Sequence, residues 1–232
     1  MDDGWETSAK AWITSMGDDG DYGRVHVLDT PMLARAEGAL NALDVGCGEG
    51  RFCRKLQAQG TKTTGIDATP TLLAAAQERD PEGTYLNARA EALPFEEGSF
   101  DLVVSYLTLI DIPDTAKAIP EMARVLAPGG KLLVANLQNF NTASNPDTWG
   151  RKAGGAVRMT LEGYLDERPN LVAWRGIKVE NWHRPLSHYM TACLDAGLTL
   201  THFAEPRAEG GDPDRAERYN SVPYFLIMEW QK

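Results

Sequence analysis

Cysteine and histidine are scarce in this chain of 232 residues. The three cysteines, Cys47, Cys53 and Cys193, form no Cys-x-x-Cys pair and leave an odd number, so a disulfide framework is not expected. The four histidines show neither His-x-His nor His-Glu-x-x-His spacing, which argues against a metal site. Free cysteines are typical of a reducing compartment, and we therefore expect a cytoplasmic protein without a metal.

Long hydrophobic runs and basic clusters are also missing. No window approaches the roughly eighteen consecutive apolar residues of a membrane span, and the opening MDDGWETSAK lacks the features of a secretory signal. The net charge is −10, and lysine and arginine do not gather into a patch that could follow a phosphate backbone. We therefore expect neither membrane nor nucleic acid as a partner. A small or neutral molecule fits this composition better.

Segments typical of strands and helices alternate between residues 39 and 137. The hydrophobic content of 43% is enough for one domain core. Short apolar runs typical of buried strands are followed by helix-like segments that end at glycine or before it. The expected strands are 39–45, 62–66, 83–87, 100–105 and 131–136, and the expected helices are 50–59, 70–79 and 115–126. This alternation predicts right-handed βαβ units and a parallel sheet.

The segments on either side of this core follow a different pattern. Residues 1–38 hold helical pieces at 5–17 and 31–38. Residues 138–184 contain two alternating stretches, Val157–Leu165 and Leu171–Trp182, which we expect to pair as an inserted antiparallel hairpin. Residues 185–232 predict a helix at 187–196 and strands at 198–204 and 224–230 that close the sheet. The whole chain is thus expected to be one α/β domain.

The motif LDVGCGEG links the first expected strand to its helix. Gly46, Gly48 and Gly50 permit a sharp turn and the close approach of a ligand, because they carry no Cβ. The dinucleotide pattern would place its third glycine at position 51, where this chain has Arg51. Asp44, just before the turn, is placed to accept hydrogen bonds from an ammonium group or a water molecule.

The motif TTGIDATP ends the second expected strand with an acidic residue. Asp67 lies 23 residues after Asp44 and is suited to accept hydrogen bonds from both hydroxyls of a ribose. An aspartate at the end of a strand is also a common helix cap. Thr69 is also placed to cap the following helix, which would leave Asp67 available for a ligand.

These motifs together resemble the class I S-adenosylmethionine-dependent methyltransferases. The resemblance rests on LDVGCGEG, GID, ARAEALPF, SFDLVVS and RVLAPGGKLLVAN, covers residues 40–137, and is nearest to the small-molecule group that includes the quinone-biosynthesis type. It implies a Rossmann-like, doubly wound, mostly parallel sheet of seven strands in the order 3-2-1-4-5-7-6, with an antiparallel edge hairpin. It also implies S-adenosylmethionine as the cofactor.

The resemblance also implies where the cofactor lies. Its methionine portion would lie over the glycine turn, its ribose on the aspartate after the second strand, its adenine beside the ARAE segment, and its sulfonium beside the end of the fourth strand. The implied cofactor-binding residues are Asp44, Gly46, Cys47, Gly48, Gly50, Asp67, Ala68, Ala90, Glu91, Ser105 and Tyr106. One departure is Arg89, which stands where the family usually has an acidic residue that accepts from the adenine amino group.

The acceptor side is less readable, and alternatives stay open there. In similar enzymes the N-terminal segment, here residues 1–38, forms a lid over the site. In this lid, Tyr22 or Arg24 is placed to hold the cofactor carboxylate, since an arginine fork binds a carboxylate bidentately. Asp111 either faces the pocket or caps the helix that begins near Pro113. His183 is the candidate general base because its ordinary pKa suits proton transfer, although a lone histidine is more often structural.

Other residues of the insertion have two interpretations. Tyr164, Trp174 and Trp182 either line an apolar acceptor pocket or pack within the hairpin, and Arg184 is placed to pair with a carboxylate. The candidate catalytic residues are thus Tyr22, Asp111 and His183.

We predict methyl transfer from S-adenosylmethionine to an oxygen, nitrogen or carbon atom of a small molecule by a monomer or homodimer. The alternatives are a nicotinamide-dependent oxidoreductase and a non-catalytic S-adenosylmethionine-binding protein.

Overall fold

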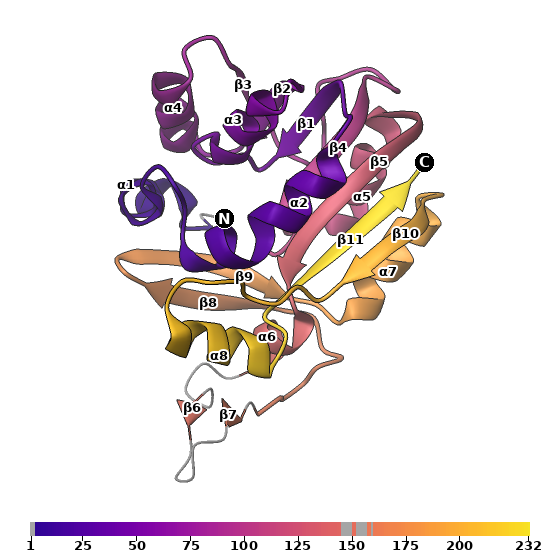
Figure 1. Cartoon of the computed structure of the whole chain (residues 1–232). Helices are drawn as coiled ribbons and strands as arrows, with labels where there is room; N and C mark the ends of the chain where they lie inside the picture. The colour runs from indigo at the N-terminus through magenta and orange to yellow at the C-terminus, as the bar shows by residue number, and fades with distance from the viewer. Residues whose placement is uncertain (1–2, 145–149, 152–156, 159) are drawn as a thin grey trace.

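A seven-stranded sheet forms the centre of the molecule, with strands in the order β10-β11-β5-β4-β1-β2-β3 (Figure 1). The computed structural model describes residues 3–144, 150–151, 157–158 and 160–232. Neighbouring strands are parallel from β5 to β3, whereas β11 runs antiparallel to β5 and β10 to β11. The strands are β1 (Asn41–Val45), β2 (Lys62–Asp67), β3 (Thr84–Asn87), β4 (Phe100–Tyr106), β5 (Leu126–Leu137), β10 (Thr199–Ala204) and β11 (Phe225–Gln231). This order confirms the predicted sheet.

Helices cover both faces of the sheet, because its central strands are apolar on both sides. On β4, Val103 belongs to one hydrophobic cluster and its neighbours Leu102 and Val104 to another on the opposite face. The first cluster includes residues of α5 and α7, and the second includes residues of α2 and α3. The helices are α1 (Trp5–Met16), the π-helix η1 (Arg24–Leu28), α2 (Asp29–Ala36), α3 (Arg51–Ala58), α4 (Pro70–Arg79), α5 (Thr115–Val125), α6 (Asn139–Ala143), α7 (Leu186–Asp195) and α8 (Pro213–Ser221).

The inserted hairpin exists, but its predicted pairing was wrong. Strands β8 (Arg168–Trp174) and β9 (Ile177–His183) pair with each other, and their turn lies inside the stretch that was expected to form one strand. Arg175 (φ 46°) and Gly176 (φ 82°) both adopt the left-handed conformation that tight two-residue hairpin turns require. Part of the other stretch, β7 (Val157–Arg158), pairs instead with β6 (Gly150–Arg151). Residue 159 and residues 145–149 of the preceding loop lie outside the described residues.

Helix α8 was absent from the expected elements, although its start carries recognisable signals. The carboxylate of Asp212 accepts a hydrogen bond from the backbone N–H of Arg215 at 2.9 Å, and Pro213 follows that cap directly. The helix belongs to the connection between β10 and β11. Figure 1 shows it on the same side of the molecule as the hairpin β8–β9.

Helix α1 is hydrogen-bonded to the hairpin β8–β9. The Ser8 hydroxyl donates to the carbonyl oxygen of Lys178 at 3.0 Å and accepts from the N–H of Lys178 at 2.9 Å. Gly4 (φ 85°) lies so near that a Cβ there would be 2.3 Å from the same carbonyl oxygen. The lid and the insertion, which are far apart in the sequence, therefore form one cover beside the carboxyl ends of the central strands (Figure 1).

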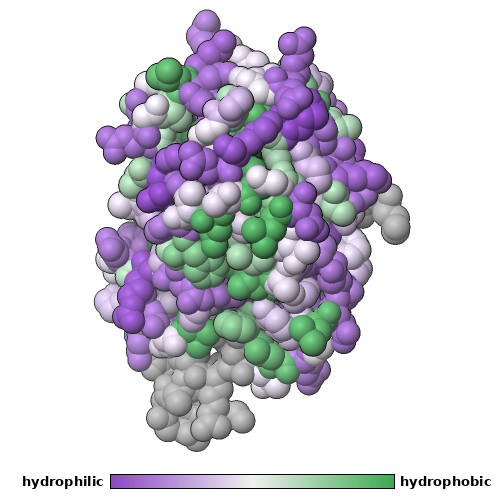
Figure 2. All heavy atoms as spheres, turned by 90° about the vertical axis from the view of Figure 1, so that its right-hand side faces the viewer, coloured by the Kyte–Doolittle hydropathy of each residue, from purple (hydrophilic) through white to green (hydrophobic). Residues whose placement is uncertain are grey.

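The opposite side of the sheet ends at β10, whose outer edge has no neighbour among the strands of this sheet. Figure 2 shows this side, where hydrophobic residues are scattered among hydrophilic ones. Leu194 on α7 and Phe203 on β10 are among the exposed hydrophobic residues of these elements. Within the described part of the chain, no helix is long and apolar enough to cross a membrane.

Candidate active site

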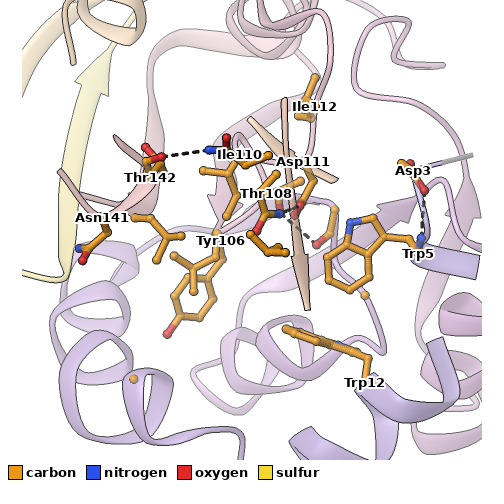
Figure 3. A pocket seen from close by; sticks show the side chains of 18 of the residues that line it. Asp3, Trp5, Trp12, Tyr106, Thr108, Ile110, Asp111, Ile112, Asn141 and Thr142 are labelled. Atoms are coloured by element: carbon orange, nitrogen blue, oxygen red, sulfur yellow. Dashed lines mark hydrogen bonds between the residues drawn. The ribbon is translucent and has the colours of Figure 1, made fainter. Parts of the chain in front are cut away.

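A cavity of about 1000 Å³ opens at the carboxyl ends of the central strands. In an open α/β sheet this is where ligands bind, because the loops that follow neighbouring strands diverge there. One wall carries the expected cofactor residues Gly46, Gly48 and Asp67, and the far wall is formed by the hairpin and by α8. Figure 3 shows the middle of this cavity, between the loop after β4 and the tryptophans of α1.

The glycine turn has the geometry that the motif predicted. Gly46, Gly48 and Gly50 all have positive φ, at 74°, 56° and 75°. A Cβ on Gly46 would lie 2.1 Å from the Thr108 side chain, so that glycine is required by packing. Around Gly48 the nearest atom to such a Cβ is the indole nitrogen of Trp12 at 3.8 Å. The turn is therefore tightly packed against Thr108 at Gly46 and open at Gly48, which leaves room for a ligand against the backbone of Gly48.

Asp67 organises this turn from the end of β2. One carboxylate oxygen accepts from the N–H of Gly48 at 2.9 Å, and the other accepts from the N–H of Thr69 at 2.8 Å. Burial raises the pKa of Asp67. Thr69 is the N-cap residue of α4, as expected, although its side chain makes no capping hydrogen bond. Asp67 lines the cavity, and each carboxylate oxygen has further lone pairs for a hydroxyl donor.

Asp44 is a buried carboxylate with an unfilled bonding position. It is only 1% exposed, and burial raises its pKa to about 7. One oxygen accepts from the Cys53 thiol at 3.5 Å, whereas Oδ1 finds no hydrogen-bond partner within the described part of the chain. Asp44 and Cys47 line a small cavity of about 50 Å³ beside Gly46 and Gly48. A cationic donor at this point would satisfy the carboxylate.

Four contacts fasten the lid to the glycine turn, the start of α3 and the end of β4. The Trp12 indole donates to Glu49 at 3.1 Å. Arg51, the residue in place of the dinucleotide glycine, donates to the backbone oxygen of Asp19 at 2.6 Å and forms a buried ion pair with Asp29. The Tyr106 hydroxyl also donates to Asp29, at 2.8 Å. Arg51 thus anchors the loop between α1 and η1 over the site.

Two further expected cofactor residues, Arg24 and Tyr106, lie beside each other, and Arg24 also lies over the ring of Trp12. The guanidinium of Arg24 lies 4.9 Å from the Trp12 ring centre and 5.7 Å from that of Tyr106, and it pairs with Asp21 at 2.8 Å. Both residues line the main cavity and the small one. Ser105, by contrast, is fully buried in β4, and its hydroxyl lines neither cavity.

The expected adenine segment lines the cavity as well. Ala68, Ala90 and Glu91 all contribute to the wall. The departure at Arg89 is accompanied by an ion pair, since its guanidinium bonds to Glu91 at 2.9 Å. A carboxylate is therefore present two residues after the position where the family usually carries it.

The loop after β4 brings Asp111 to the middle of the cavity (Figure 3). Its carboxylate accepts from the Asn181 amide at 2.5 Å and from the side chain of Trp5. Burial raises its pKa well above the ordinary range. The cap of α5 is Asp114, which accepts from the N–H of Lys117, so Asp111 faces the pocket and does not cap the helix. Sequence reasoning missed Trp5 and Asn181 as its partners, since nothing in their spacing relates them to Asp111.

His183 lies away from this cavity. It is completely buried on β9, with Nδ1 2.7 Å from the Thr142 hydroxyl and Nε2 2.9 Å from the carbonyl oxygen of Tyr164. Burial lowers its pKa. Arg184, also buried, donates to the backbone oxygens of Leu109, Ile112 and Pro113, and so fixes the loop after β4. These contacts favour the structural interpretation of both residues.

Tyr22 occupies the outer rim. Its hydroxyl donates to the backbone oxygen of Gly210 at 3.0 Å, and its ring packs 5.2 Å from that of Tyr219 on α8. Trp174 lines the same outer part of the cavity, whereas Tyr164 and Trp182 pack within the insertion. Sequence reasoning missed α8 as a wall of the site, and its capping signals were the available clue. In the described ranges, no group of three or more potential ligands is arranged to hold a metal ion.

The chain is similar to known methyltransferases in sequence and in fold. Residues 43–134 match a methyltransferase domain family. A malonyl-[acyl-carrier protein] O-methyltransferase of Erwinia pyrifoliae is 31% identical over 180 residues, covering 68% of this chain and 69% of that protein. A chloroplastic tocopherol O-methyltransferase of Arabidopsis thaliana is 30% identical over 176 residues, covering 68% of this chain and 50% of that protein.

A solved structure supports the same relationship over a greater length. The crystal structure of an S-adenosylmethionine-dependent methyltransferase from Mesorhizobium loti superposes with a TM-score of 0.78 at 25% identity, covering 93% of this chain and all of that one. The chain belongs to the class I S-adenosylmethionine-dependent methyltransferases, and its cofactor is S-adenosylmethionine. This assignment agrees with Arg51 standing where a nicotinamide-binding turn has glycine.

Proposed function

We propose that this enzyme transfers the methyl group of S-adenosylmethionine to an oxygen atom of a small molecule bound between the hairpin and α8. One observation carries the proposal: a single cavity joins the glycine turn and Asp67 to the insertion. The choice of oxygen is supported by two relatives, which are named as O-methyltransferases of malonyl-[acyl-carrier protein] and tocopherol.

The residues present fit the cofactor. We assign the ribose hydroxyls to Asp67, the α-ammonium group to the unpartnered oxygen of Asp44, and the carboxylate to Arg24. The adenine ring would lie between Ala68 and Ala90, with Glu91 near its amino group. When bound, the cofactor supplies a sulfonium-activated methyl group, so the protein has mainly to position the acceptor and exclude water.

Asp111 is the residue that we assign to the acceptor hydroxyl. It lies in the loop after β4, next to Thr108, which packs on the glycine turn. Its raised pKa makes it a stronger base than an exposed aspartate, because burial disfavours the charge that protonation removes. As the oxygen–methyl bond forms, the hydroxyl proton would pass to this carboxylate. Such a base contributes on the order of 10²–10⁴-fold to the rate.

The test is turnover with a panel of phenols, carboxylic acids and amines, followed by mass spectrometry of the products. We expect methylated oxygen compounds, and we expect Asp111→Asn to lower kcat without changing the affinity for S-adenosylhomocysteine. Methylated amines alone would overturn the choice of oxygen. An unchanged kcat in Asp111→Asn would remove Asp111 from the mechanism. The cytoplasmic location and the monomeric or homodimeric state remain predictions from the sequence.

A further inference from the structure

The charges that line the cavity differ between the walls built from the two halves of the chain. Among the residues that the structure describes, the walls built from positions before 114 contribute Asp3, Asp21, Asp67, Glu91 and Asp111, against two arginines. The described residues after position 137 contribute four arginines, at 168, 175, 215 and 218, against one carboxylate, Glu162. Because the whole chain carries a net charge of −10, this gathering of arginines runs against its overall composition.

Several of the arginines around the cavity already have a partner. Arg24 pairs with Asp21 and is the residue assigned to the cofactor carboxylate, and Arg89 pairs with Glu91. Arg168 donates to the backbone oxygens of Gly163, Glu162 and Asp166, so it supports the insertion. These contacts account for both arginines of the first set of walls and for one arginine of the second set.

Arg175 and Arg215 are different. Arg175 is exposed at the tip of the β8–β9 turn, and Arg215 is exposed on the first turns of α8. Among the described residues, neither guanidinium has a carboxylate within ion-pair distance, and that of Arg215 lies 5.7 Å from the ring centre of Tyr22. The hairpin and α8 approach the cavity from separate parts of the chain, so both elements present a free cation to the same space.

The elements that carry these arginines also bring hydrophobic side chains to the cavity. Leu171 is 67% exposed and Trp174 is 38% exposed, although both line the cavity, and Tyr219 and Phe225 line it from the other side. Exposed apolar side chains on a cavity wall are a common sign of an apolar ligand. An arginine fork at the end of such a wall recognises a carboxylate or phosphate by bidentate hydrogen bonds.

We infer that the acceptor is an amphipathic small molecule whose apolar body lies along Leu171 and Trp174 and whose anionic end is held by Arg175 and Arg215. This inference rests on the proposed function and names the chemical class of its substrate. It replaces the preference for a neutral acceptor that composition alone suggested, because net charge does not show where the charges lie.

Three probes with the same alkyl chain test the inference: octanoate, octyl phosphate and octanol. Each is titrated calorimetrically into protein saturated with S-adenosylhomocysteine. We expect at least one anion to bind about tenfold or more tightly than the alcohol, as one charge-assisted hydrogen bond provides. A preference for octanoate shows that the anionic end of the acceptor is a carboxylate, and a preference for octyl phosphate shows that it is a phosphate ester. Equal binding of all three probes overturns the inference.

Variants assign the anion to its site. Arg175→Asn keeps a residue that tolerates the left-handed turn, and Arg215→Gln keeps an exposed polar side chain on α8. We expect the double variant to bind the anions about as weakly as the alcohol, while Arg207→Gln, outside the cavity lining, changes nothing. An anion preference that survives in the double variant overturns the inference. Failure to bind S-adenosylhomocysteine would instead refute the proposed function, since that step is measured before any probe is added.

Discussion

Replacing Asp44 with asparagine should remove a large pH dependence from the stability of the protein. The carboxyl group is 1% exposed, and its pKa rises from 3.8 to about 7 because burial disfavours the charged form. A group whose pKa is higher in the folded state than in the unfolded state holds its proton longer when folded. Stability is therefore unaffected below pH 4 or so and falls as the pH rises from about 4 to about 7.

The size of the effect follows from the same two values. A carboxyl group that ionises at about 7 instead of 3.8 costs the folded state on the order of 4 kcal/mol at pH 8. The asparagine side chain of the variant would carry no such cost, although its amide N–H₂ would be buried without a partner, which costs about 1–3 kcal/mol at every pH. The difference in unfolding free energy between the two proteins should thus change by about 4 kcal/mol between pH 4 and pH 8.

Cofactor binding should be coupled to the same proton. An ammonium group at the unpartnered oxygen favours the ionised carboxylate, so binding lowers the pKa and releases a proton near neutral pH. The affinity for S-adenosylhomocysteine should then rise as the pH increases from about 6 to about 8 in the wild-type protein, and stay flat in Asp44→Asn. The assays are urea unfolding and calorimetry across this range. Parallel pH profiles of wild type and variant in both assays would refute the reasoning.

Two further substitutions test the lid and the histidine. Arg51→Met leaves the buried carboxylate of Asp29 without its main partner, so we expect a loss of about 3–5 kcal/mol in urea unfolding and weaker cofactor binding. Arg207→Met is the control, and an unchanged affinity in Arg51→Met would show that this anchor does not support the lid. His183→Gln should lower the melting temperature, because both ring nitrogens are hydrogen-bonded in the interior, yet leave the pH profile of kcat unchanged. A shifted pH profile would restore His183 as a general base.

The sheet and the cofactor residues could be predicted because their signals are local. The apolar run of each strand and the glycines after β1 determine the βα turn within a few residues. Asp67 follows from the same logic, since the end of β2 lies beside that turn in every parallel arrangement of this order.

The acceptor side could not be predicted to the same degree, because its walls come from distant segments. The contacts of Asp111 with Trp5 and Asn181 join α1, the loop after β4 and the hairpin, which are far apart in the sequence. The chemistry of His183 suggested a base, but burial decides whether its nitrogens can reach a substrate, and burial is a property of the folded chain. Arg175 illustrates the same limit, because its turn divided one alternating stretch into two strands.

The most direct test of the account is calorimetric titration of S-adenosylhomocysteine into the wild-type protein, Asp67→Asn and the exposed control Asp195→Asn. We predict that wild type and the control bind one equivalent with the same affinity. Asp67→Asn should bind about 10²-fold or more weakly, since two charge-assisted hydrogen bonds of about 1.5–3 kcal/mol each are weakened. Absence of binding to the wild-type protein, or equal affinity in Asp67→Asn, would contradict the assignment of the glycine turn and Asp67 as the cofactor site.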